Sequence, residues 1–197
     1  MAPRADRSRD TLPGHVVEAL ERARRAGFRL SSEPAVGRLL AVLAAGVPAG
    51  GRILELGTGV GVGLGWLAHG LGGRSDVEVR SVEADRDTAA LAQEGRWPAH
   101  VLVILGDAEL YVRDHPASFD LIFADAPGGK WEGLEHTIAA LRPGGHLVVD
   151  DMRPDAWIDE THRTKTAEVH ARLLGSPALV SVEIEWASGV ILCTRSG

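Results

Sequence analysis

The chain has 197 residues, of which 45% are hydrophobic and 24% charged, and its formal net charge is −6. This length predicts one domain with a sizeable core, and the acidic balance without a Lys/Arg-rich block argues against a nucleic-acid partner. The polar N-terminus lacks an apolar signal segment, and no apolar run is long enough to span a bilayer, so we expect a cytoplasmic protein without a membrane partner.

The N-terminal region predicts two helices. We expect residues 1–10 to form a disordered tail and residues 11–197 to form a single domain, with the N-terminal helices within residues 11–46. Apolar residues at helical spacing predict the first helix over His15–Ala26. A serine cap followed by Pro34 in the first turn predicts the start of the second helix.

Beyond these helices, short apolar runs alternate with helical segments. This alternation predicts a parallel sheet covered on both faces. The last two apolar runs flank a short Ala-Ser-Gly turn and predict an antiparallel hairpin. The predicted strands are Arg52–Leu56, Val77–Glu83, Val101–Leu105, Leu121–Asp125, His146–Asp150, Val180–Trp186 and Val190–Arg195. The predicted helices are Gly61–Gly70, Arg86–Glu94, Glu109–Arg113, Gly133–Leu141 and one that follows Pro154 and ends near Leu174.

The first predicted strand ends in the pattern Glu55-x-Gly57-x-Gly59-x-Gly61, in which Thr58 is one of the intervening residues. Glycines at these positions let the backbone approach a ligand closely, because no Cβ intervenes. A dinucleotide-binding Gly-x-Gly-x-x-Gly would need a third glycine where Val62 stands. The pattern instead resembles the first motif of the Rossmann-like S-adenosylmethionine (SAM) methyltransferases. The terminal hairpin also resembles their sheet, so the resemblance implies a seven-stranded, mostly parallel sheet with helices on both faces.

Further residues at the strand ends suit a nucleoside. Glu83, followed by Ala84, ends the second strand, and its two carboxylate oxygens can accept hydrogen bonds from both ribose hydroxyls. The resemblance implies that Glu55 orients the glycine loop or the methionine amino group. It also implies that Asp107, followed by Ala108, contacts the adenine amine, with a simple Asp turn as the alternative.

Three acids lie at the ends of the fourth and fifth strands, namely Asp125, Asp150 and Asp151. If these strands are neighbours, their ends lie about 5 Å apart and the carboxylates share one cleft. Such carboxylates repel one another, so either one takes up a proton or a cation compensates the charge, and oxygen ligands suit Mg²⁺. The alternative is that one of the adjacent aspartates points away, because side chains alternate along extended backbone.

The segment from about residue 33 to residue 151 resembles the cation-dependent O-methyltransferases of the catechol and caffeoyl-CoA type. Those enzymes bind a metal with an Asp after the fourth strand and an Asp-Asn pair after the fifth, and here Asp151 replaces the Asn. They also carry a lysine after the fourth-strand Asp. The resemblance implies that Lys130 takes the acceptor proton, with a solvated loop lysine as the alternative, because its spacing is longer than in catechol-type enzymes. Gly63 stands where many of these enzymes have a cofactor-binding serine.

The sequence therefore predicts a SAM-dependent O-methyltransferase that acts on a small hydroxylated acceptor, aromatic acceptors included, with a divalent cation. Trp131 and Trp157 are predicted to wall the acceptor site. His162 is expected at the surface, with the cleft as the alternative. The resembling families imply a homodimer. The competing hypotheses are a metal-independent methyltransferase, a nicotinamide-dependent oxidoreductase and a non-catalytic SAM-binding module.

Overall fold

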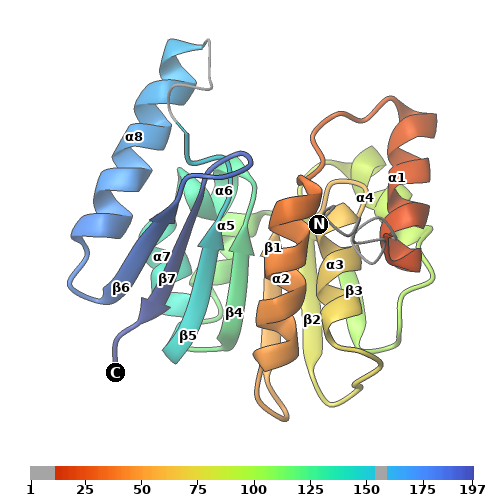
Figure 1. Ribbon diagram of the computed structural model, residues 1–197, viewed down its shortest axis with the longest axis horizontal. Coiled ribbons are helices and arrows are strands. Elements are labelled where there is room, and N and C mark those ends of the chain that lie inside the picture. Colours follow the sequence, from red (N-terminus) through yellow and green to blue (C-terminus); the bar gives the residue numbers. More distant parts are fainter. Residues whose placement is uncertain (1–11, 154–158) are drawn as a thin grey trace, which may run out of the picture.

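The computed structural model describes residues 12–153 and 159–197 and contains a seven-stranded sheet of order β3-β2-β1-β4-β5-β7-β6 (Figure 1). Neighbouring strands from β3 to β5 are parallel, whereas β7 lies antiparallel between β5 and β6. The predicted Rossmann-like fold with its terminal hairpin is therefore confirmed. The strands are β1 (Arg52–Leu56), β2 (Glu78–Glu83), β3 (Val101–Leu105), β4 (Phe119–Ala124), β5 (Leu141–Val149), β6 (Leu179–Ile184) and β7 (Val190–Arg195).

Helices cover both faces of this sheet, and strand residues alternate between two cores because successive side chains point to opposite faces. Ile53 and Phe123 pack in the core that includes α1, α2 and α3, whereas Leu54 and Ile122 pack in the core that includes α5, α7 and α8. The helices are α1 (Gly14–Ala26), α2 (Pro34–Gly46), α3 (Val62–Gly70), α4 (Arg86–Gln93), α5 (Ala108–Arg113), α6 (Pro127–Lys130), α7 (Leu134–Ala140) and α8 (Glu160–Gly175).

The start of α2 differs from the prediction. Pro34 is the first helical residue, as expected, but the N-cap is Glu33 and no side chain caps this end. The hydroxyl of Ser32 instead donates to Asp125 Oδ2, at 3.2 Å. The predicted serine cap is therefore wrong, because Ser32 donates to Asp125 just after β4 rather than to the backbone of α2.

The boundary between α7 and β5 was also predicted differently, and the helix predicted after Pro154 is α8. β5 begins at Leu141, which was assigned to a helix, because its pairing with β4 shifts register between Phe119–Leu141 and Leu121–His146 around a Pro-Gly-Gly segment. α8 begins at Glu160, where the Asp159 carboxylate accepts from the backbone N–H of His162 at 2.8 Å. The predicted tail, residues 1–10, and Trp157 lie outside the described residues.

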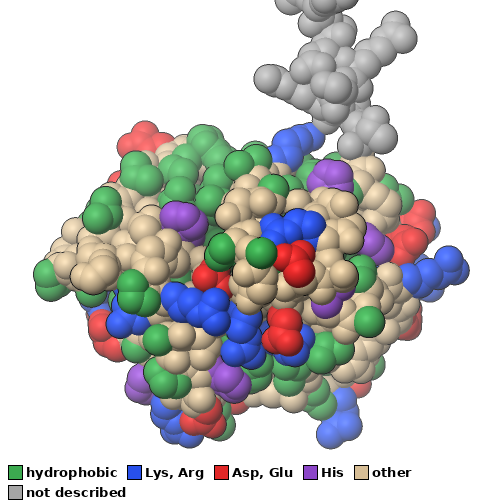
Figure 2. Space-filling view, turned by 90° about the horizontal axis from the view of Figure 1, so that it is seen from below, with side chains coloured by type: hydrophobic (Ala, Val, Ile, Leu, Met, Phe, Trp, Pro, Cys, Tyr) green, Lys and Arg blue, Asp and Glu red, His purple; other side chains and the backbone are tan. Residues whose placement is uncertain are grey.

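Opposite charges are interspersed on the face seen from below in Figure 2. At the amino ends of the strands, Arg52 pairs with Glu78 at 3.3 Å and Arg142 pairs with Asp120 at 2.8 Å. In the described ranges, no helix combines the length and the apolar character needed to cross a membrane.

The contact between α2 and α3 depends on a glycine. A Cβ on Gly70 would lie 2.2 Å from the carbonyl oxygen of Ala41 and 2.7 Å from its Cα, both backbone atoms. We therefore expect Gly70→Ala to force the helices apart and to lower the free energy of unfolding by about 1–3 kcal/mol, measured by urea denaturation. Gly46→Ala is the matched control, because its Cβ would meet nothing within 4 Å. It should leave stability unchanged or raise it by up to about 1 kcal/mol; equal losses in both variants would contradict the packing argument.

Candidate functional site

Two cavities lie side by side at the carboxyl ends of the strands, where the strand order reverses between β1 and β4. The first, of about 290 Å³, is here called the glycine-loop cavity, and the second, of about 370 Å³, the acidic cavity. Asp125 lines both, together with Leu30, Ser31, Ser32 and Pro127. The glycine-loop cavity is also lined by Glu55, Gly57, Thr58, Gly59, Glu83 and Asp85. The acidic cavity is also lined by Lys130, Trp131, Asp150, Asp151, His162 and Ser188.

The loop after β1 depends on its alternate glycines. Gly57, Gly59 and Gly61 have φ values of 94°, 54° and 92°, in the left-handed region that disfavours residues with a Cβ. A Cβ on Gly57 would also lie 3.0 Å from the carbonyl oxygen of Asp125. The glycine pattern thus lets the loops after β1 and β4 touch, which brings the two cavities together.

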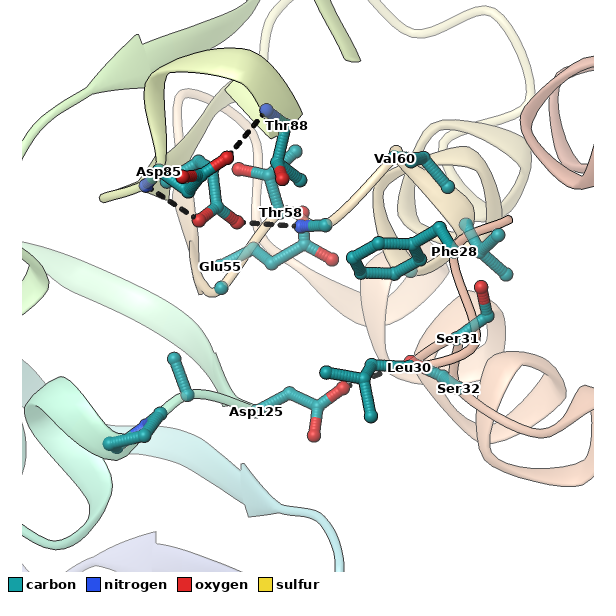
Figure 3. A pocket seen from close by; sticks show the side chains of 17 residues that line it. Phe28, Leu30, Ser31, Ser32, Glu55, Thr58, Val60, Asp85, Thr88 and Asp125 are labelled. Carbon is teal, nitrogen blue, oxygen red and sulfur yellow. Dashed lines mark hydrogen bonds between the residues drawn. The ribbon is translucent and has the colours of Figure 1, made fainter. Parts of the chain in front are cut away.

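Glu83 is held rigidly beside this loop. Its Oε2 accepts from the backbone N–H of Gly59 at 2.8 Å, and its Oε1 accepts from that of Asp85 at 3.0 Å (Figure 3). Asp85 in turn caps α4 by accepting from Thr88 N–H at 2.8 Å. Each carboxylate oxygen keeps a further lone pair, so Glu83 is oriented and still able to accept bonds from a diol.

Glu55 is buried beneath the loop, with 1% of its surface exposed. Its Oε2 accepts from the Ser81 hydroxyl, which lies 2.6 Å from the Thr58 hydroxyl. Burial raises the pKa of Glu55 well above its usual range, and the hydrogen bond from Ser81 opposes this effect. The charges of Asp125 and Glu83 raise the pKa further.

This raised pKa predicts that Glu55 makes the unliganded fold less stable as the pH rises. Above about pH 4.5 the unfolded chain releases the Glu55 proton while the folded protein keeps it, so the free energy of unfolding falls until the pH passes the folded pKa. Glu55→Gln should lack this pH dependence. Between pH 5 and pH 8, its free energy of unfolding, measured by urea denaturation, should therefore rise relative to that of the wild type. The exposed Glu21→Gln serves as control. Parallel stability curves for Glu55→Gln and wild type would contradict the assignment.

The same carboxylate accounts for Gly63. A Cβ at that position would lie 2.2 Å from Glu55 Oε1. The glycine therefore makes room for the buried acid at the place where many resembling enzymes have a serine.

Several predicted cofactor residues lie outside the lining of the glycine-loop cavity, namely Gly61, Ala84, Asp107 and Ala108. The Asp107 carboxylate accepts from Leu110 N–H at 3.0 Å and caps α5. This contact matches the alternative prediction of an Asp turn.

The acidic cavity brings Asp125, Asp150 and Asp151 together, as predicted. Asp150 Oδ1 accepts from the Asp151 backbone N–H at 2.8 Å and from the Ser188 hydroxyl. Burial, followed by the Asp150 charge, raises the pKa of Asp125, and burial together with the Asp151 charge raises the pKa of Asp150. Within residues 12–153 and 159–197, however, no three His, Cys, Asp or Glu side chains are arranged to hold a metal ion.

Lys130 is the cationic member of this group. Only 4% of it is exposed, and its Nζ donates to the backbone carbonyl of Asp150 at 3.1 Å. Its charge lowers the pKa values of Asp125 and Asp150, against the larger effect of burial. The alternative prediction of a solvated loop lysine is therefore wrong, because the turn of α6 directs the side chain inward.

Some residues that line the cavities were not predicted from the sequence. Figure 3 shows Leu30 and Ser32, from the segment between α1 and α2, beside Asp125, and Ser31 of the same segment also lines the glycine-loop cavity. No periodic pattern marks such a segment. Ser188 could have been predicted from the sequence. It lies in the turn before β7, and because β7 runs antiparallel to β5, this turn lies at the carboxyl end of β5. His162, expected at the surface, lines the acidic cavity, as does the predicted Trp131.

Comparisons with known proteins agree with this geometry. A family model described as a methyltransferase domain matches residues 54–152. A protein of Mycolicibacterium smegmatis named "Putative O-methyltransferase/" is 34% identical over 192 residues, which cover 91% of this chain and 90% of that protein. A "Putative O-methyltransferase" of Mycolicibacterium vanbaalenii is 35% identical over 141 residues. This match covers 68% of this chain and 61% of that protein, which is less than two thirds of its length. The O-methyltransferase TomG from Streptomyces achromogenes, involved in tomaymycin synthesis and solved in complex with SAM, has a TM-score of 0.79 at 25% identity, covering 95% of this chain and 92% of TomG.

Proposed function

Because the chain belongs to the family of SAM-dependent O-methyltransferases, we propose that it transfers the methyl group of SAM to a hydroxyl oxygen of a small acceptor. The observation that carries this proposal is the pair of cavities that meet at Asp125. A donor in one cavity and an acceptor in the other would have their reacting atoms next to this residue. Holding the two in line supplies much of the rate of such a transfer.

We propose that SAM, the methyl-donating substrate, occupies the glycine-loop cavity. Glu83 accepts bonds from the ribose hydroxyls, and the glycine loop and Glu55 position the methionine part. The orientation of Glu83 by two backbone N–H groups supports its role. The hydroxyl of Ser31, which is buried without a hydrogen-bond partner among the described residues, supports a polar ligand in this place. Asp107 and its neighbour Ala108 are proposed at the adenine end.

A divalent cation is proposed for the acidic cavity. The donor chemistry fits, because all three aspartates offer oxygen ligands and the burial of the Asp125 and Asp150 carboxylates favours a compensating charge. Asp125, Asp150 and Asp151 would hold the ion, and their side chains must first converge. When bound, a cation of this kind lowers the pKa of an acceptor hydroxyl.

Within the acidic cavity, we assign Lys130 and Asp125 to the reaction itself. The Lys130 ammonium uses one proton for the Asp150 carbonyl and keeps two that can face an acceptor oxygen as negative charge develops on it. Asp125 separates the two cavities and can orient the acceptor hydroxyl toward the donor. Trp131 offers an aromatic wall for a planar acceptor.

Turnover and chelation test this function. The protein is incubated with SAM and a panel of catechols, phenols and aliphatic alcohols, and S-adenosylhomocysteine is measured before and after treatment with EDTA. We expect methylation of at least one hydroxylated acceptor, loss of activity on chelation and recovery with Mg²⁺. Activity that survives thorough chelation would contradict the proposed cation and favour a metal-independent methyltransferase. Binding of SAM without any turnover would favour the binding module.

The proposal includes a small-molecule acceptor, no nucleic-acid partner and a homodimer. The interspersed charges and net charge of −6 support the second point. Val180 and Val182, which are 71% and 52% exposed on the edge strand β6, support the third.

A further inference from the structure

His162 lies in the first turn of α8, on the wall of the acidic cavity. Its backbone is fixed, because its N–H donates to the Asp159 carboxylate at the helix cap. Its ring meets the Trp131 ring edge-on, with the centroids 4.3 Å apart and the planes at 88°. Helix and aromatic wall together direct this imidazole to the cavity that also contains Lys130, Asp125 and Asp150.

The surroundings of His162 favour a neutral ring. Burial lowers the pKa of His162 below its usual value and the Lys130 charge lowers it further, whereas the charges of Asp151 and Asp159 oppose this effect. A second cation, Lys165, lies with its Nζ 5.1 Å from the centre of the Trp131 ring. An imidazole that is neutral near pH 7 has a ring nitrogen able to take up a proton.

Lys130 is arranged for a different task. It is an ammonium whose Nζ donates to the Asp150 carbonyl and whose neighbours are carboxylates. A group held in this way compensates negative charge and has no lone pair to offer while it is charged. Beside the three aspartates, which are proposed to hold a cation, the described part of the acidic cavity therefore holds Lys130, suited to stabilise an anion, and His162, suited to accept a proton.

We propose that His162 is a catalytic residue of the O-methyl transfer, acting as the general base for the acceptor hydroxyl. The acceptor oxygen forms a bond to the methyl carbon as the carbon–sulfur bond breaks, and the electron pair of that bond stays on sulfur as the thioether of S-adenosylhomocysteine. The hydroxyl proton passes to a ring nitrogen of His162 and then to solvent. This inference rests on the proposed O-methyl transfer and adds to it the destination of the proton.

The charged groups around His162 set the expected pH dependence. A base that must be neutral predicts a rate that rises with pH up to its pKa and then levels off. Replacing His162 should therefore remove the rising part of the plot of kcat against pH. The charged and titratable groups that face the ring or line its cavity are Asp159 and Lys165 of α8 and its cap, Lys130 of α6, Asp125, Asp150 and Asp151 after the strands, and Arg29 and Glu33 of the segment between α1 and α2.

The test compares His162→Gln and His162→Ala with His170→Gln. The control residue lies on the same helix but pairs with Glu183 at 3.1 Å, away from the cavity. Methylation of 3,4-dihydroxybenzoate, or of the best acceptor from the panel, is followed at saturating SAM from pH 5.5 to 9, and SAM binding is measured by calorimetry. We expect the His162 variants to lose about 10²- to 10⁴-fold in kcat and to lose the rising pH limb, with SAM affinity unchanged. Added imidazole should restore part of the activity of His162→Ala, and His170→Gln should match the wild type.

The possible outcomes separate the two levels of the proposal. A wild-type kcat and pH profile in His162→Gln, or an effect on the acceptor KM alone, would overturn the assignment of His162 while leaving the methyltransferase function intact. A wild-type protein that binds SAM and methylates no acceptor would overturn the proposed function, and the assignment of His162 with it. Loss of kcat without rescue by imidazole, together with a lowered melting temperature, would mean that His162 acts through the fold and would also overturn it.

Discussion

Replacing Glu83 with glutamine is expected to weaken the binding of SAM by about 100- to 1,000-fold. The carboxylate is already held by the N–H groups of Gly59 and Asp85, so no reorganisation is needed before it meets the ribose. Hydrogen bonds to a charged group contribute about 1.5–3 kcal/mol each, and two ribose hydroxyls would lose that charge. Every 1.4 kcal/mol corresponds to roughly tenfold in the dissociation constant. The glutamine amide also points an N–H toward one of the two backbone donors, which disturbs the glycine loop itself.

Calorimetry with SAM and with S-adenosylhomocysteine measures this effect. Both ligands carry the same ribose, so their affinities should fall by the same factor. Glu78→Gln is the matched control, because Glu78 lies at the opposite end of the same strand and is exposed. It should bind both ligands within about twofold of the wild type, well under 1 kcal/mol. A Glu83→Gln protein that binds as tightly as this control would rule out the ribose contact.

The strands and the acids at their ends could be predicted because each feature has a local signal. An apolar run predicts a buried strand, and topology then brings its last residue to the same edge as its neighbours. Glu55, Glu83, Asp125 and Asp150 were found in this way. The alternation of strands and helices also fixed the fold, because parallel strands need crossover connections.

Some residues that line the cavities could not be found by the same reasoning. Ser32 reads as a helix cap in the sequence, since Pro34 follows, and only the three-dimensional arrangement gives it Asp125 as a partner. His162 lies on a helix whose polar composition suggests solvent, although its first turn faces the cavity. The sequence allowed Lys130 to be either a catalytic residue or a solvated loop lysine, because the conformation of the preceding Pro-Gly-Gly turn decides which way the Lys130 side chain points. Side-chain direction in a loop or first turn depends on tertiary contacts, which a single sequence does not display.

The second large effect is expected from Asp150→Asn, which should lower methyl transfer by about 100-fold or more while raising the stability of the unliganded protein. Asn keeps the oxygen that accepts from the Asp151 N–H and the Ser188 hydroxyl, so the local structure should persist. It removes one of the buried charges that raise the pKa of Asp125. Burial of the Asp150 carboxylate outweighs the compensation from the Lys130 charge, so this charge disfavours folding. The same charge is what would attract a divalent ion and position the acceptor, and electrostatic groups of this kind are worth about 10²–10³ in rate.

Melting temperatures with and without Mg²⁺ separate these two roles. Without the ion, Asp150→Asn should melt above the wild type, and with increasing Mg²⁺ the wild type should gain stability by mass action while the variant gains much less. Asp114→Asn provides the control, since Asp114 is an exposed acid at the end of α5 that pairs only with the neighbouring Arg113 among the described residues; its activity and Mg²⁺ response should match the wild type. Equal stabilisation of the wild type and Asp150→Asn by Mg²⁺ would mean that the ion binds elsewhere. Full activity in the variant would mean that the acidic cavity works without the Asp150 charge.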